Sequence, residues 1–250
     1  MSMNLFHWLI EEISEHHGTT VIMFHRGESL LHPGIAKMLN YAKGKVSRIV
    51  LATNGMLLSG ELGQTILNTV DFLSLSLDTK ERFAATRIGG DYERIVRNMK
   101  SFLIDNQSRI ETQVSMVRTD NVGDKDVREF ISTWEGLVDR VRIYDEHSHD
   151  GKFGSVVKEK TIREPCSKVF TQTVVSWDGE IRRCNHDWNG NPLGNAIEDS
   201  IVDVWNGEAY KSLRKQHNSG QITDTVCVPC GSWYEGDEAG RGILVKRGVK

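Results

Sequence analysis

The sequence predicts an α/β protein with parallel strands, followed by a small domain built from a β-hairpin and a helix. Up to about residue 150, short apolar runs alternate with segments of helical period. This alternation favours a parallel sheet, because parallel neighbours need a crossover connection and helices supply it. After residue 160 the alternation stops, and Asp178-Gly179 lies between two short runs of strand character. This dipeptide is a strong signal for a hairpin turn.

Five apolar runs are the predicted strands, at residues 21–25, 48–55, 71–78, 110–119 and 139–147. The segments between them carry apolar residues at helical spacing, at 32–45, 59–70, 91–106 and 127–138. In open parallel sheets, ligands bind at the carboxyl ends of the strands. That rule selects four short polar segments that follow strand ends, namely 26–29, 53–55, 76–78 and 118–120.

The chain is expected to divide into three parts. Residues 1–150 are predicted to form the βα core, and residues 160–235 a second domain. This second domain holds the hairpin and a helix predicted over 200–220. The remaining basic, glycine-rich residues 236–250 are predicted to form a flexible tail.

Composition excludes several classes of partner. With 31 basic and 34 acidic residues the net charge is −3, so no basic surface for nucleic acid is expected. The first residues lack the basic and continuous apolar regions of a signal peptide. The apolar runs are also far shorter than the roughly 20 residues that a membrane span needs. We therefore expect a cytoplasmic protein with no membrane partner, in which regularly spaced cysteines are metal ligands or catalytic groups.

The four cysteines are Cys166, Cys184, Cys227 and Cys230. The hairpin can bring the first two together, and the CxxC pair returns after a helix. Four thiolates make a closed tetrahedral set that suits zinc or an iron-sulfur cluster, and the spacing leaves both open. Two other interpretations are separate buried thiols and a redox pair. His186 and Asp187, beside Cys184, are either groups that support the metal ligands or solvated neighbours.

Several ordered motifs resemble the radical SAM enzymes of the SPASM/twitch class. The pattern CX12GX4C from Cys166 to Cys184, followed by CX2C, resembles the auxiliary-cluster region of that family. Upstream, "RGESLLHP", "LATNG", "LSLDT" and "RIGGDYERIVRNMKSF" resemble successive strand-end motifs of its partial barrel. The resemblance covers roughly residues 1–232. It implies an incomplete radical SAM-type βα barrel and one auxiliary 4Fe-4S cluster on the four cysteines, with zinc as the alternative.

The resemblance also implies contacts to S-adenosylmethionine (SAM). Gly27 and Glu28 match the GE motif, where backbone groups hold the amino group of SAM, although Ser29 stands where the family usually has proline. Thr53 and Asn54 match the turn after the next strand.

Three further positions match the cofactor site of the family. Ser76 and Asp78 lie at a strand end that contacts the ribose or carboxylate of SAM. Arg87 matches an arginine near the cofactor carboxylate, a role that suits a guanidinium fork.

The family's CxxxCxxC loop, whose thiolates hold the SAM-cleaving cluster, has no counterpart in the sequence. The resemblance begins one strand and one loop later. We expect either an amino-terminally truncated enzyme, the preferred explanation, or a degenerate relative that keeps the auxiliary cluster. As written, the chain is not expected to cleave SAM.

The function that the resemblance implies is that of an oxidoreductase or maturase whose auxiliary cluster transfers electrons. Its substrate is a small molecule or a peptide, and its electron partner is a reduced flavodoxin or ferredoxin. The alternative is a non-catalytic iron-sulfur or zinc-binding protein derived from such an enzyme. The sequence identifies no catalytic residue.

Overall fold

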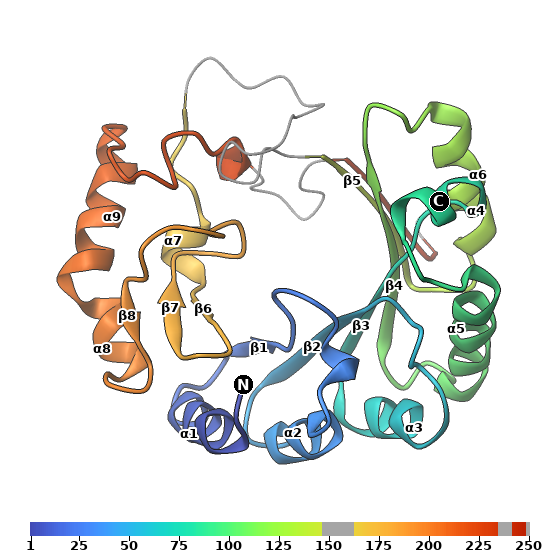
Figure 1. Cartoon of the computed structure of the whole chain (residues 1–250), viewed down its shortest axis with the longest axis horizontal. Coiled ribbons are helices and arrows are strands. Elements are labelled where there is room, and N and C mark those ends of the chain that lie inside the picture. Colours follow the sequence, from blue (N-terminus) through green and yellow to red (C-terminus); the bar gives the residue numbers. More distant parts are fainter. Residues whose placement is uncertain (147–162, 235–241, 249–250) are drawn as a thin grey trace. The chain divides into compact units, whose positions relative to one another are not determined.

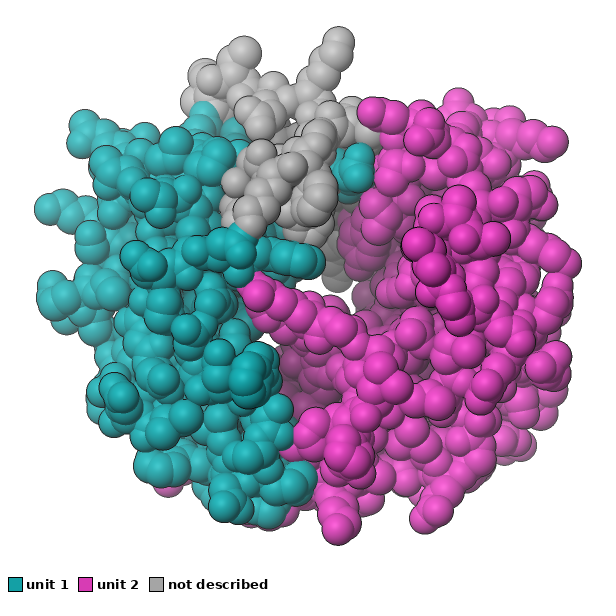
Figure 2. All heavy atoms as spheres, viewed as in Figure 1, with its two compact units in different colours: residues 1–12, 145–241 teal, residues 13–144, 242–250 magenta. Residues whose placement is uncertain are grey.

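A computed structural model describes residues 1–146, 163–234 and 242–248. The chain divides into two compact units, coloured separately in Figure 2. One unit, here called the cysteine unit, comprises Met1–Glu12 and Asp145–Arg241. The other, here called the sheet unit, comprises Ile13–Tyr144 and Gly242–Lys250.

The sheet unit contains a six-stranded sheet in the order β1-β2-β3-β4-β5-β9 (Figure 1). Its strands are β1 (Thr20–Ile22), β2 (Arg48–Thr53), β3 (Phe72–Ser76), β4 (Glu111–Arg118), β5 (Arg140–Asp145) and β9 (Ile243–Lys246). The first four are parallel neighbours in sequence order, as βα units require. Together with the intervening helices, they confirm the predicted α/β fold with a parallel sheet.

Helices connect these strands and cover the outer side of the curved sheet (Figure 1). They are α2 (Ile35–Ala42), α3 (Gly60–Thr69), α4 (Lys80–Thr86), α5 (Tyr92–Asn106) and α6 (Asp124–Trp134), with a short 3-10 turn at Ser29–Leu31. One set of alternating strand side chains, including Leu51, Leu73, Leu75 and Val114, is fully buried. The other set includes Ser74 and Gln113, which are hydrogen-bonded at 3.0 Å. The sheet therefore has one apolar face and one more polar face.

The cysteine unit is built around a small antiparallel sheet in the order β6-β7-β8. Its strands are β6 (Val174–Val175), β7 (Glu180–Arg182) and β8 (Gly194–Asn195). Its helices are α1 (Met3–Ser14, whose last two residues belong to the sheet unit), α7 (Lys168–Thr171), α8 (Ile201–Asn206) and α9 (Glu208–Ser219), with a 3-10 turn at Ser232–Tyr234. The predicted hairpin is confirmed, and Gly179 in its turn has a φ of 92°. A left-handed backbone of this kind is what glycine supplies most readily.

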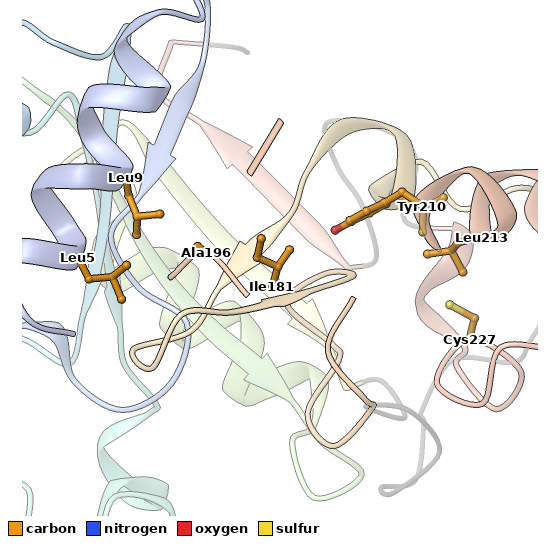
Figure 3. Packing of buried hydrophobic residues seen from close by; sticks show 8 residues of the cluster. Leu5, Leu9, Ile181, Ala196, Tyr210, Leu213 and Cys227 are labelled. Atoms are coloured by element: carbon orange, nitrogen blue, oxygen red, sulfur yellow. The ribbon is translucent and has the colours of Figure 1, made fainter. Parts of the chain in front are cut away.

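The apolar core of the cysteine unit joins segments that are far apart in sequence (Figure 3). Its buried members are Leu5, Leu9, Val169, Ile181, Ala196, Tyr210, Leu213 and Cys227. The start of α1 therefore belongs to this unit, because two of its leucines complete the core. The expectation that residues 1–150 form one domain differs from the structure at this helix.

Two further expectations need correction. Residues 243–246 of the predicted flexible tail form β9, which pairs antiparallel with β5. The helix predicted over 200–220 is interrupted at Gly207, where ψ is 174° and the backbone is extended. An extended residue ends one helix and lets the next begin at a different angle. The rest of the predicted tail lies largely outside the described residues.

No helix in the described ranges combines the length and the apolar character needed to cross a membrane. The longest among them, α5, has 15 residues.

Candidate metal centre

The four cysteines all lie on loops of the cysteine unit, and none of the four is in a disulfide bond. Cys166 precedes α7 and is half-buried, whereas Cys184 follows β7 and is buried. Cys227 is buried and Cys230 half-buried in the turn that follows α9. The unit thus presents thiols from three separate chain segments.

The thiols share one electrostatic neighbourhood. Burial, with smaller contributions from the charges of Cys230 and Cys166, raises the pKa of Cys184 to about 12. Burial also raises the pKa of Cys227 above its ordinary value, with added contributions from Asp224, Cys184 and Cys230. Such thiols are protonated at neutral pH, and a metal that binds them must displace the protons.

Within the described ranges, no three His, Cys, Asp or Glu side chains are gathered closely enough to form a metal-binding group. The charges of neighbouring cysteines raise the pKa of Cys184 and Cys227, but the four sulfurs do not form a closed ligand shell in the structure. The assignment of these four cysteines as a ligand set stays a prediction. Its fit can be judged from the chemistry of the loops.

Backbone groups in these loops support thiolate ligands. The backbone N–H of His186 donates to the sulfur of Cys184, and the N–H of Ser232 donates to Cys230 Sγ at 3.4 Å. Within the CxxC turn, Cys230 N–H donates to Cys227 O at 3.2 Å. Hydrogen bonds to sulfur stabilise the thiolate form and tune iron-sulfur clusters. Four soft donors with such support fit an iron-sulfur cluster or zinc.

His186 and Asp187 are buried, with exposed fractions of 3% and 0%. The interpretation of them as solvated neighbours of Cys184 is therefore wrong. Asp187 N–H donates to Cys184 O at 3.1 Å, so this residue is part of the turn that carries the thiol.

Sequence reasoning missed three side chains that hold the cysteine loops, namely Arg163, Asp224 and His217. His217 Nδ1 accepts a hydrogen bond from Cys166 N–H at 3.3 Å, and Asp224 Oδ1 accepts one from Cys227 N–H at 3.1 Å. The only sequence signal was proximity to the cysteines, because Arg163 and Asp224 each lie three residues before one of them.

In the sheet unit, the structure brings three of the predicted SAM contacts together. The Glu28 carboxylate accepts hydrogen bonds from Thr53 Oγ1 at 2.8 Å, from Asn54 N–H at 2.7 Å and from Leu30 N–H at 3.0 Å. Gly27 beside it has a φ of 73°. The Glu28 side chain thus organises two strand-end loops, and both of its oxygens are engaged there.

The other predicted contacts lie around the end of β3. Asp78 Oδ2 accepts hydrogen bonds from Arg87 Nε at 2.8 Å and from Thr86 Oγ1 at 2.9 Å. Ser76 is half-buried and lies opposite Ser115 in the register. The structure therefore brings Asp78 and Arg87 together as an ion pair, and their roles toward a cofactor stay predictions.

Residues 166–231 match SPASM, a family described as an iron-sulfur cluster-binding domain. The solved structures similar to this chain include BtrN in complex with AdoMet and 2-DOIA, at 18% identity and a TM-score of 0.58, over 92% of this chain and 80% of that one. The chain has the fold of the radical SAM enzymes and carries a SPASM domain. The resemblance seen in the sequence is confirmed at that level.

Two other solved structures have the same fold. Streptococcus suis SuiB bound to precursor peptide SuiA matches at 14% identity and a TM-score of 0.69, over 91% of this chain and 62% of that one. Native anSMEcpe with bound AdoMet matches at 14% identity and a TM-score of 0.66, over 96% and 84%.

A curated relative, GTP 3',8-cyclase of Chlorobaculum tepidum, is 29% identical over 105 residues. This alignment covers 40% of the present chain and 32% of the relative, so it spans about a third of that protein.

Proposed function

We propose that the SPASM domain of this chain holds one auxiliary 4Fe-4S cluster on Cys166, Cys184, Cys227 and Cys230. The observation that carries the proposal is that all four cysteines of the chain fall within the matched SPASM residues. The charges of neighbouring cysteines also raise the pKa of Cys184 and of Cys227. Backbone N–H groups directed at two of the sulfurs support the same ligand set. When bound, such a cluster supplies one-electron transfer.

Four protein thiolates occupy every iron of such a cluster. No iron is then left open for substrate, so the proposed role is electron transfer and not direct ligation of substrate. In this proposal the chain's own residues fix the cluster, keep water from the buried Cys184 and Cys227, and stabilise the thiolates by hydrogen bonding.

The proposed reaction class is that of an oxidoreductase or maturase of the radical SAM/SPASM type. Among the similar proteins, BtrN is described with AdoMet and 2-DOIA, and SuiB with its precursor peptide. These support a small molecule or a peptide as the substrate class. A reduced flavodoxin or ferredoxin is the proposed electron partner. The given residues supply no thiolates beyond the four, so for them the proposal covers cluster binding and not SAM cleavage.

SAM contacts are proposed at the strand ends of the sheet unit. Gly27 offers backbone groups to the amino group of SAM, while Glu28 acts through the loop at Thr53 and Asn54 that it holds in place. Ser76, Asp78 and Arg87 are the proposed contacts at the next strand end.

A zinc site with a non-catalytic role is the second candidate, because a closed set of four thiolates suits zinc equally well. Anaerobic purification, reconstitution with iron and sulfide, metal analysis and an optical spectrum separate the two. We expect about four irons and four sulfides per chain, the composition of a 4Fe-4S cluster, and loss of the chromophore in Cys→Ser variants. Stoichiometric zinc with no iron would overturn the iron-sulfur proposal and favour the alternative.

A further inference from the structure

Arg183 connects two cysteine-bearing loops of the cysteine unit. It directly precedes Cys184, and its guanidinium donates to Asp224 Oδ2 from Nη2 at 2.7 Å and from Nε at 2.9 Å. Asp224 lies 41 residues further along the chain, three residues before Cys227. The side chain beside one thiol therefore reaches the loop that carries the CxxC pair.

Asp224 also binds the backbone of the CxxC turn. Its second oxygen, Oδ1, accepts hydrogen bonds from Val226 N–H and Cys227 N–H, both at 3.1 Å. One carboxylate oxygen thus faces Arg183 and the other fixes the backbone at Cys227. A displacement of Arg183 should therefore change the position of Cys227, because only the Asp224 side chain lies between them.

Arg183 also fixes the turn that follows Cys184. Its Nη1 donates to Asp187 Oδ2 at 2.8 Å and to Asn191 O at 2.9 Å, and Asp187 Oδ1 accepts from Gly190 N–H at 3.0 Å. The Arg183 side chain is 7% exposed and that of Asp187 is 0% exposed. Buried charges of this kind are tolerated only when they are paired and hydrogen-bonded, so the network cannot lose one member cheaply.

Arg163 makes an equivalent link from the third cysteine segment. It lies three residues before Cys166, and its guanidinium donates to Cys227 O at 2.6 Å and to Val228 O at 3.1 Å. The ring of Trp233 lies 5.9 Å from the guanidinium carbon. The CxxC turn is therefore held on its carbonyl side by Arg163 and on its N–H side by Asp224.

We propose that Arg183 and Arg163 are positioning residues that fasten the CxxC turn to the Cys184 and Cys166 segments and so preorganise the four-thiol site. This inference rests on the proposed function, because the site is the one assigned above to the auxiliary cluster. Neither arginine is proposed as a metal ligand. Their effect is to keep three separate loops within reach of one bound group.

Arginine suits this task for a geometrical reason. Its planar guanidinium offers five N–H donors in a rigid fork, which allows Arg183 to hold two carboxylates and a carbonyl at once. A lysine at this position keeps the charge but presents a single ammonium, which cannot span Asp187, Asp224 and Asn191 O together. A lysine variant is therefore expected to restore little of the function.

The test uses Arg183→Met, Arg183→Lys and Arg163→Met in the full chain, reconstituted anaerobically. Release of iron to a chelator is timed after removal of excess metal, and the midpoint potential and electron paramagnetic resonance spectrum of the cluster are recorded. Loss of a group that supports metal ligands typically weakens metal binding by about 10- to 100-fold, so we expect Arg183→Met to release iron at least about 10-fold faster. Arg183→Lys should remain close to Arg183→Met, and Arg163→Met should fall between it and the wild type.

Arg214→Met is the matched control in the same unit. Arg214 donates to Val169 O at 3.0 Å and to Trp205 O at 2.8 Å, and its guanidinium carbon lies 4.1 Å from the centre of the Trp205 ring. The Arg214→Met substitution is expected to lower the melting temperature while leaving iron release and the midpoint potential unchanged. A residue whose substitution changes only the melting temperature has a structural role alone. If Arg183→Met changed the melting temperature but not iron release or the midpoint potential, the proposal would be overturned.

Asp224→Asn covers the case in which Arg183→Met does not fold. The amide keeps an oxygen for the N–H groups of Val226 and Cys227 but loses the charge that Arg183 holds. It should also accelerate iron release by itself. Where Arg183→Met does fold, the double variant Arg183→Met/Asp224→Asn should release iron no faster than the worse single variant, because the two residues act as one link. Strict additivity of the two effects would contradict a shared link.

The proposed function and this inference fail in different ways. A wild type that takes up no iron-sulfur cluster overturns the proposed function, and zinc release then gives the same comparison of variants. A wild type that holds its cluster, with Arg183 and Arg163 variants that release iron at the same rate, overturns the positioning role alone.

Discussion

The Glu28 carboxylate accepts a hydrogen bond from the backbone N–H of Asn54 at 2.7 Å, across 26 residues of sequence. The same carboxylate accepts from Thr53 Oγ1, so the loop after β1 is fastened to the end of β2. These two loops lie at the carboxyl ends of neighbouring parallel strands, where α/β proteins bind their ligands. Glu28 therefore fixes the shape of this edge of the sheet, where the cofactor contacts are proposed.

Replacing Glu28 by Gln should destabilise the sheet unit. The amide keeps one acceptor oxygen, but its NH₂ group replaces the second oxygen and cannot accept a hydrogen bond from the donors on that side. Hydrogen bonds to charged groups contribute about 1.5–3 kcal/mol, so we expect a loss of about 2 kcal/mol in the free energy of unfolding. Urea denaturation measures it, with Glu15→Gln at an exposed position as the control. Equal stability of the two variants would show that the Glu28 contacts do not hold the loops.

Gly55 is predicted to resist substitution because of both its backbone and its surroundings. Its φ is 79°, and a Cβ atom there lies 2.5 Å from Leu75 Cδ1. Left-handed strain costs about 1–2 kcal/mol and overpacking adds about 1–3 kcal/mol, so Gly55→Ala should cost about 2–5 kcal/mol.

Gly44 provides the matched control for Gly55. It has a φ of 80°, and nothing lies within 4 Å of an added Cβ. Gly44→Ala should therefore cost only the backbone strain of about 1–2 kcal/mol. Thermal unfolding of the two variants isolates the packing contribution, and equal costs would mean that Leu75 yields without penalty.

The Asp78–Arg87 ion pair is predicted to be a structural contact of modest strength. The two side chains are 14% and 29% exposed, and they lie 2.8 Å apart. A double-mutant cycle with Asp78→Asn and Arg87→Met should give a coupling of about 1 kcal/mol, because solvent screens a partly exposed pair. Calorimetric titration of the same variants with SAM tests their proposed cofactor contacts. SAM binding that Arg87→Met leaves unchanged would remove Arg87 from the cofactor site.

Tyr210 is expected to hold the hairpin of the cysteine unit against α9. Burial raises its pKa to about 12, so the phenol is protonated at neutral pH. Its hydroxyl lies 2.7 Å from Thr173 Oγ1 and 3.1 Å from Arg182 O. Tyr210→Phe leaves these groups short of a partner and should cost about 1–2 kcal/mol in the free energy of unfolding. Phe102→Tyr, which buries a hydroxyl in the sheet unit, should also lower the melting temperature. It serves as a reference for the cost of one buried polar group without a hydrogen-bond partner.

Much of the fold could be predicted because its signals are local. The strands at 48–53 and 72–76 and the turn at Gly179 each follow from the residues within the element itself. The break at Gly207 was also local but was missed, since a single glycine within a helical period does not reveal an extended backbone. The helix at residues 3–14 was placed in the wrong unit, because its periodicity shows an apolar face without showing which core that face joins.

The sequence by itself determined the βα order, the hairpin and the spacing of four cysteines that the SPASM match confirms as the region of an iron-sulfur cluster-binding domain. Tertiary structure alone decided which distant groups interact. Arg183 is paired with Asp224, Glu28 accepts a hydrogen bond from Asn54 N–H, and β9 pairs with β5. The physical reason is that periodicity and turn chemistry act over a few neighbouring residues. A buried ion pair or a strand pairing instead depends on which distant segments the packed core brings within about 3 Å, the range of a hydrogen bond.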